Sequence, residues 1–268
     1  MPLRSLRVAW LLPAAILAVG GCSRLSFVRP DVSRGEYTQT APVVRVGDGD
    51  RKPVMAIHDR LLLAQDRLRA GRLDEAKSHA EAVLGLDPRS GDAHTVLALV
   101  AGRQGRQADA GRHFARAAEL APTGATLNNH GAWLCGNGRP AEALAWFDRA
   151  LADPAYRERA GALANAGDCA LRAGQDARAD RDLREALRLD PGSTVALSAM
   201  AALALRRGDA FAARAFSQRR LAAGPADRHA LQLASQIEQE LGDTAAAERY
   251  TRRLRAEFGD HPAHSGDQ

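Results

Sequence analysis

The chain has 268 residues, of which 46% are hydrophobic but only 4% are aromatic, and its formal net charge is +5. Every basic residue except Lys52 and Lys77 is arginine, which indicates a compositional bias. No basic tract with interleaved aromatic residues occurs, so the charge does not predict nucleic-acid binding.

The N-terminus has the features of an export signal. Arg4 and Arg7 precede an apolar stretch over residues 8–19, and small residues follow that stretch. The apolar stretch is too short to span a bilayer comfortably as a helix, so we expect a cleaved signal and not a membrane anchor. Loss of the two arginines with the signal leaves a net charge of about +3.

The end of this signal resembles the lipoprotein box of bacteria. Val19 is followed by two glycines and Cys22. The resemblance implies that residues 1–21 are removed, that Cys22 carries the acyl groups, and that Ser23, standing where an Asp would favour the inner membrane, directs the protein to the outer membrane. We therefore expect a lipid-anchored protein facing the periplasm. An ordinary secretory signal with a chance cysteine is the alternative.

Residues 22–55 show no helical period and contain three prolines and three glycines. This composition predicts a flexible tether between the lipid anchor and the rest of the chain. The last residues, 259–268, also lack a pattern, and we expect a disordered tail there.

Between residues 57 and 258 one unit is repeated six times. A glycine recurs at intervals of 34, 33, 36, 34 and 34 residues, and an alanine follows each glycine five residues later. The glycine is expected to end a first helix, and the small alanine to lie where the second helix crosses the first. A period near 34 is typical of tetratricopeptide (TPR) repeats. The sequence predicts an all-α, superhelical solenoid with repeats at about 57–90, 91–123, 124–159, 160–193, 194–227 and 228–258.

The junction between the third and fourth units departs from this period. It reads ADPAYRERAGA, is two residues longer than the others, and adds Tyr156. We expect an inserted turn at this position.

Two cysteines, Cys135 and Cys169, remain after Cys22 is assigned to lipid. They lie near the ends of the first helices of the third and fourth units, in a chain expected to reach an oxidising compartment. They form either a disulfide or two buried free thiols that act as small apolar fillers.

A TPR solenoid binds partners along the groove lined by its first helices. Four units carry an arginine two residues before the glycine, and these arginines either clamp carboxylates of a partner or interact with the helix dipole. The adjacent asparagines of the third unit and one of the fourth either contact a partner or join neighbouring repeats. No catalytic, metal-binding or phosphate-binding arrangement occurs, so we expect a non-enzymatic protein without a cofactor. The candidate groove residues are Arg69, Arg103, Arg172, Arg206, Asn128, Asn129 and Asn165.

The third and fourth units carry the most specific signal in the chain. They read NNHGAWLCGNGRPAEALAWFDRAL and then DPAYRERAGALANAGDCALRAG. These strings resemble the type IV pilus biogenesis and stability lipoproteins of the PilW and PilF family, whose segment reads Asn-Asn-Tyr-Gly, two further residues, Leu-Cys, and later Asn-x-Gly-x-Cys. His130 replaces the tyrosine of that pattern.

This resemblance implies a pilotin. Such an outer-membrane lipoprotein binds the subunit of the type IV pilus secretin (PilQ-like) and promotes its localisation and multimerisation, and hence pilus biogenesis and twitching motility. The resemblance also implies a disulfide between Cys135 and Cys169. The alternative function is a general TPR scaffold for other envelope enzymes, such as those acting on peptidoglycan. We expect a monomer, because the last repeat has a polar outer face.

Overall fold

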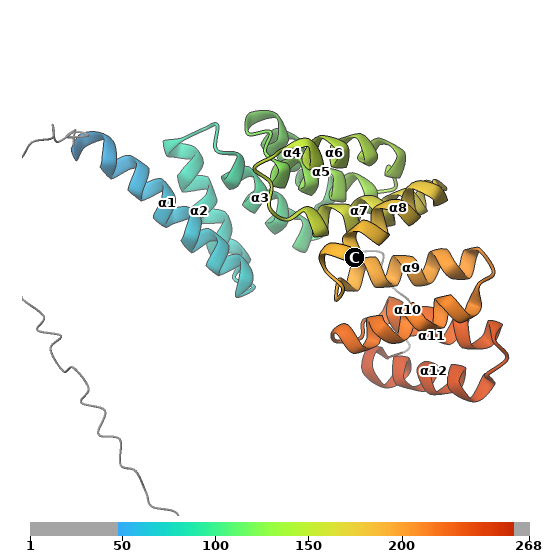
Figure 1. The fold of residues 1–268 in the computed structure, drawn as a ribbon. Helices are drawn as coiled ribbons and strands as arrows, with labels where there is room; N and C mark the ends of the chain where they lie inside the picture. The colour runs from blue at the N-terminus through green and yellow to red at the C-terminus, as the bar shows by residue number, and fades with distance from the viewer. Residues whose placement is uncertain (1–47, 260–268) are drawn as a thin grey trace, which may run out of the picture. The chain divides into compact units, whose positions relative to one another are not determined.

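A computed structural model describes residues 48–259 of the chain. This part is entirely helical and forms six helical hairpins that stack one after another (Figure 1). The all-α TPR solenoid predicted from the sequence is confirmed. The helices are α1 (Asp48–Arg69), α2 (Leu73–Leu86), α3 (Gly91–Arg103), α4 (Gln107–Leu120), α5 (Gly124–Gly136), α6 (Pro140–Ala152), α7 (Arg159–Arg172), α8 (Asp176–Leu189), α9 (Thr194–Arg206), α10 (Ala210–Ala223), α11 (Arg228–Glu240) and α12 (Thr244–Phe258).

Each hairpin turns at one of the repeated glycines, whose φ angles lie between 73° and 78°. At the first turn, the backbone N–H of Gly71 donates to the carbonyl of Leu68 (3.1 Å), and that of Arg72 donates to the carbonyl of Arg67 (2.8 Å). These bonds satisfy carbonyls that the end of α1 would leave unpaired, and they require the left-handed conformation that glycine adopts without strain.

The first helices of successive hairpins form one layer. Within the described residues, α1 packs on α3, α3 on α5, α5 on α7, α7 on α9 and α9 on α11, whereas the backbones of successive second helices do not approach one another in this way. The first helices therefore form the inner wall of the solenoid, which is the wall expected to carry the binding groove.

Small residues allow the two helices of each hairpin to pack closely. The six repeated alanines, from Ala76 to Ala247, are at most 3% exposed. The largest apolar cluster extends from α5 to α9 and includes the fully buried Phe147 and Leu183. Smaller apolar clusters lie on either side of it, and partly buried side chains such as Trp133 and Trp146 pack against two of these clusters at once.

The junction between α6 and α7 is longer than the others, as the sequence predicts. Residues 153–158 form this linker, and its Tyr156 is buried against the first residue of α5, Gly124. The carboxylate of Asp153 accepts a hydrogen bond from the backbone N–H of Gly124 (2.7 Å). The inserted turn thus covers and caps the start of the preceding hairpin.

One boundary differs from the sequence prediction. The tether was expected to extend to residue 55, but α1 begins at Asp48. Pro53 and the glycines before it were taken as signs of a flexible chain. A proline in the second turn removes only one helical hydrogen bond, however, and the helix-forming leucines that follow compensate for it.

The predicted signal, Cys22, most of the tether and residues 260–268 lie outside the described part of the chain. Within the described helices, none is both long and apolar enough to cross a membrane.

Candidate functional site

A groove lies between the first helices of the first two hairpins, on the inner wall of the solenoid. Its volume is about 280 Å³. Its centre is apolar, and polar side chains surround the apolar part. We call it the N-terminal groove, and it is lined by Gln65, Leu68 and Arg69 of α1 and by Asp92, Thr95, Val96 and Leu99 of α3.

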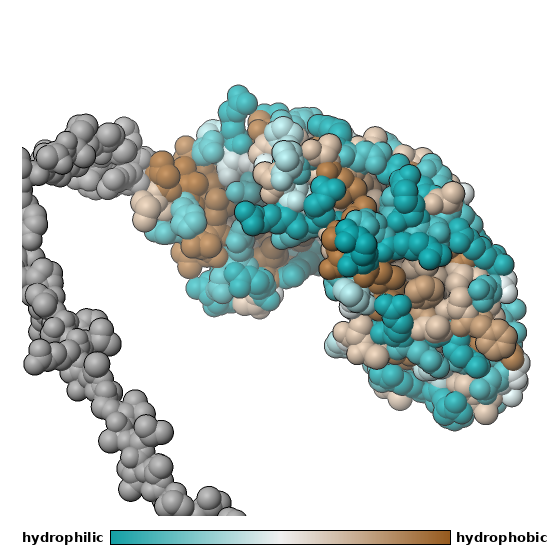
Figure 2. Space-filling view, viewed as in Figure 1, coloured by the Kyte–Doolittle hydropathy of each residue, from teal (hydrophilic) through white to brown (hydrophobic). Residues whose placement is uncertain are grey.

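Apolar side chains are exposed on the first hairpin and in this groove. Leu62 and Leu63 of α1 are 49% and 41% exposed, and Leu99 of α3 is 41% exposed. Figure 2 shows hydrophobic surface at the α1 end of the array, and further hydrophobic surface in the middle of the array. In the second hairpin, the residues equivalent to the two leucines of α1 are Val96 and Leu97, which are buried by the hairpin before them. Within the described residues no hairpin precedes the first one, and its leucines are exposed there.

A larger open depression of about 570 Å³ lies on the outer face of α12, where a further repeat would stack. Most of its lining residues are polar types, including Thr244, Glu248 and Thr251, although the surface that they present is largely apolar, as it is in the N-terminal groove. Polar residues are expected on the last repeat of a solenoid, which must remain soluble without a neighbour. We therefore regard the N-terminal groove as the better candidate for protein binding.

The four predicted arginines do not form one uniform basic surface. Arg103 donates to the carbonyl of Leu68, and Arg206 donates to the carbonyl of Leu171 (2.9 Å). Both guanidinium groups thus bind the last turn of the first helix in the preceding hairpin, where the helix dipole favours a cation. Arg206 also pairs with Asp176 (2.8 Å).

The other two arginines differ from this pair. Arg172 forms an ion pair with Asp168 in its own helix (2.9 Å). Arg69 belongs to the first hairpin, is exposed at the edge of the N-terminal groove, and has no ion-pair partner among the described residues. Arg69 is therefore the member of the set best placed to bind a carboxylate of a partner.

The asparagines lie on the inner wall in the middle of the array. The side-chain amide of Asn165 in α7 donates to the side-chain oxygen of Asn128 in α5 (3.2 Å). This bond favours the inter-repeat role for these two residues. Asn129 is half-buried and has no side-chain hydrogen bond within residues 48–259, so its amide is available to a partner.

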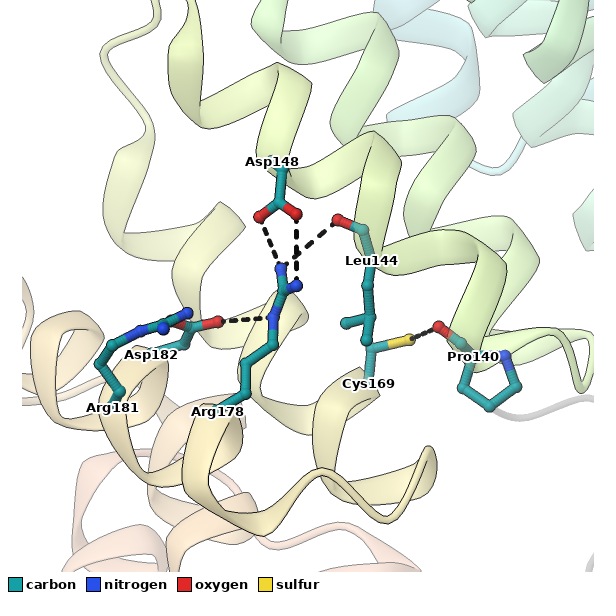
Figure 3. Close-up of polar contacts among 7 residues, drawn as sticks. All are labelled: Pro140, Leu144, Asp148, Cys169, Arg178, Arg181 and Asp182. Atoms are coloured by element: carbon teal, nitrogen blue, oxygen red, sulfur yellow. Dashed lines mark hydrogen bonds and ion pairs between the residues drawn. The ribbon is translucent and has the colours of Figure 1, made fainter.

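Two cross-links join the third and fourth hairpins. Cys135 of α5 and Cys169 of α7 form a disulfide with a Cα–Cα distance of 5.8 Å, and the Cys169 sulfur lies 3.4 Å from the carbonyl oxygen of Pro140. On the second helices, Arg178 of α8 pairs with Asp148 of α6 (2.6 Å) and with the buried Asp182 (3.3 Å) (Figure 3). The disulfide restrains this junction between the first helices, α5 and α7, and the Arg178–Asp148 pair restrains it between the second helices, α6 and α8.

An aromatic cluster packs beside this junction. Trp133 of α5 lies against Gly111 of α4, and the buried His130 stacks on Trp133 and meets the edge of Trp146. Burial lowers the pKa of His130 more than its neighbouring charges change it. Arg149 lies over the Trp146 ring, 4.5 Å from its centroid. The cluster belongs mainly to the core.

Sequence reasoning missed the exposed leucines of α1, at the start of the described array. The sequence did contain an indication of them. Leu61, Leu62 and Leu63 are consecutive, and a helix that buries a single apolar stripe cannot bury three consecutive side chains. Sequence reasoning also missed that His94 of α3 meets His113 of α4, since a contact between residues 19 positions apart leaves no short-range pattern.

Comparison with known proteins places this fold beside pilus biogenesis proteins. The crystal structure of PilW, described as a widely conserved type IV pilus biogenesis factor, has a TM-score of 0.69 and 28% identity, over 76% of this chain and 94% of that chain. PilF of Pseudomonas aeruginosa has a TM-score of 0.67 and 24% identity, over 78% of this chain and 95% of that chain. The latter identity by itself supports only a common fold.

A TPR protein from Parabacteroides merdae also shares the fold, with a TM-score of 0.58, 18% identity, and coverage of 79% of this chain and 83% of that chain. No family model matches the chain, and the search of curated proteins gave no match either. The resemblance predicted from the repeats and from the motif around the two cysteines is confirmed by the structural neighbours. The chain is a TPR protein similar to the type IV pilus biogenesis proteins PilW and PilF.

Proposed function

We propose that this protein is a pilotin, an outer-membrane lipoprotein that binds a subunit of the type IV pilus secretin and promotes its localisation and multimerisation. The observation that carries the proposal is the likeness to PilW along 94% of that chain, in a solenoid with an open apolar groove at its first hairpins. The role is assembly by binding and requires no chemical step.

The N-terminal groove can hold a segment of the secretin subunit. Leu99 in the groove, and Leu62 and Leu63 on the face of α1 that no described hairpin covers, offer contact to apolar residues of such a segment. Arg69 offers a fork for a carboxylate. Apolar contact supplies about 25 cal/mol per Å² of buried surface, whereas an exposed ion pair adds at most about 1 kcal/mol. The leucines should therefore contribute most of the affinity.

The lipid anchor would hold the bound secretin subunit at the membrane. Each buried methylene contributes about 0.8 kcal/mol to membrane binding, so acyl groups on Cys22 would hold the protein at the membrane. A subunit bound in the groove is then confined near the membrane, which raises its effective concentration for assembly into a ring.

Complementation of cells that lack the protein tests the proposal. Wild type should restore heat-resistant secretin multimers, whereas Leu62→Glu and Leu99→Glu should leave the subunit as monomer, since they place a charge on the exposed apolar face of α1 and in the groove, respectively. Leu189→Glu is the matched control, because Leu189 is 43% exposed on α8, away from the groove. Levels of each variant are checked by immunoblot.

Multimers that form normally without the protein would refute the pilotin function. If cell-wall shape changes in those cells instead, the protein serves as a scaffold for envelope enzymes. Loss of assembly with Cys22→Ser, together with retention of secretin binding by the purified variant, would separate the anchor from the groove.

A further inference from the structure

Two histidines face each other across the second hairpin. The Nδ1 atoms of His94 in α3 and His113 in α4 lie 3.0 Å apart, and the ring centroids lie 5.3 Å apart. The two nitrogens therefore lie nearly on the line between the rings, and the lone pair of each points at the other. This is the geometry of an N–H···N hydrogen bond. Two ligands of one metal ion would instead point together at a position beside that line.

The number of protons on the pair decides whether this bond exists. When one Nδ1 carries a proton and the other does not, the first ring donates and the second accepts. The bond survives the first added proton, because one Nδ1 can still accept. A second added proton leaves no acceptor and sets two cationic rings against each other, which is unfavourable at this separation.

The surroundings keep the pair neutral at neutral pH. Burial is the main cause that lowers the pKa of both rings, and the proximity of His113 and Arg116 lowers that of His94 further. Asp109 opposes the effect on His113, but its carboxylate is already paired with two arginines. The charged groups acting on the pair are Glu81 of α2, Arg106 in the turn before α4, and Asp109, Arg112 and Arg116 of α4.

The position of α3 matters to the N-terminal groove. Thr95 and Leu99 of α3 form one wall of the groove, while the neighbouring His94 contacts α4. A contact that fixes α3 against α4 therefore restrains the helix that forms this wall.

We propose that His94 and His113 form a proton-operated latch, which holds α3 against α4 while at least one ring is neutral and releases it when both rings are protonated. Acidification then loosens the second hairpin and one wall of the N-terminal groove. The effect on client binding rests on the proposed function, whereas the latch itself does not.

The chain supplies a matched control in its first hairpin. His79 of α2 occupies the same repeat position as His113, eight residues after the hairpin glycine. The position that corresponds to His94 is Arg60 in that hairpin, so no histidine stands at that position to face His79. A variant at His79 changes the number of histidines without changing the latch.

Hydrogen–deuterium exchange of the purified, disulfide-intact protein tests the latch. Between about pH 7.5 and about pH 5, after correction for intrinsic rates, exchange in α3 and α4 of the wild type should rise on the order of fivefold relative to α9 and α10. His79→Gln should show the same rise, whereas His94→Gln and His113→Gln should not, since glutamine cannot become a second cation. An equal rise in all four proteins would overturn the proposal.

NMR of the wild-type rings gives an independent test that needs no substitution. The two rings should titrate in two coupled steps, with the second well below the ordinary histidine pKa of 6.5. Two independent titrations near that value would exclude the latch. The outcome is separate from secretin binding: a latch without binding would refute the proposed function, and binding without coupled titration would refute the latch.

Discussion

Replacing both cysteines of the Cys135–Cys169 disulfide with alanine should destabilise the array by about 3–4 kcal/mol. The cysteines are 34 positions apart, and closing a loop of this length in the unfolded chain accounts for roughly that free energy in the entropic model. For an array of this size, the midpoint of thermal unfolding should fall by roughly 10 °C.

Urea denaturation followed by tryptophan fluorescence is a suitable assay, since Trp133 and Trp146 lie beside the junction that the disulfide restrains. Each single alanine variant should lose nearly as much stability as the double variant, because either substitution breaks the same bond. Reduced wild type should match the double variant. Stability of the double variant within about 1 kcal/mol of wild type would refute the reasoning, as it would mean that the helices hold the junction without the bond.

Three further changes test other parts of the structure. Arg178→Ala should cost about 2 kcal/mol in urea unfolding, because the buried Asp182 loses one of its two arginines; no loss would mean that Arg181 suffices. Because burial lowers the pKa of His130, the unfolded chain binds more protons than the folded one below pH 6.5, and the free energy of unfolding should decrease as the pH falls below that value. His130→Phe should make the urea midpoint depend less on pH in this range. An unchanged dependence would contradict this explanation. Gly124→Ala should lower the thermal midpoint, at a cost of about 1–3 kcal/mol, because the added Cβ would lie 2.3 Å from Cγ of Tyr156; an unchanged midpoint would show that the linker yields freely.

The repeat architecture could be predicted because each unit specifies it locally. A glycine such as Gly71 is needed for the positive φ at the turn, and an alanine such as Ala76 is needed where the two helices cross. Both requirements recur in every hairpin, so their spacing alone reveals the period. The long linker around Tyr156 was visible for the same reason, as an interruption of that spacing.

The roles of individual groove residues could not be predicted in this way. Arg69, Arg103 and Arg206 occupy the same repeat position, yet Arg103 and Arg206 bind the preceding hairpin and Arg69 has none to bind. The contacts of these arginines therefore depend on whether a hairpin precedes their own, and not on the residue type. The contact of His94 with His113 similarly depends on how two helices pack, and no local pattern encodes it.

The two ends of the array differ in a way that bears on where a partner should bind. Val96 and Leu97 are 2% and 6% exposed, whereas Leu62 and Leu63, at the same repeat positions, are 49% and 41% exposed. Among residues 48–259, no hairpin precedes theirs. At the opposite end, the corresponding residues of α12 are mostly of polar types. The end repeats of a solenoid usually carry polar residues on their outer faces. Exposed apolar residues at one end therefore indicate a surface that binds a partner. A client therefore gains most from apolar burial at the first hairpin, and substitutions there should weaken binding more than substitutions along the middle of the inner wall.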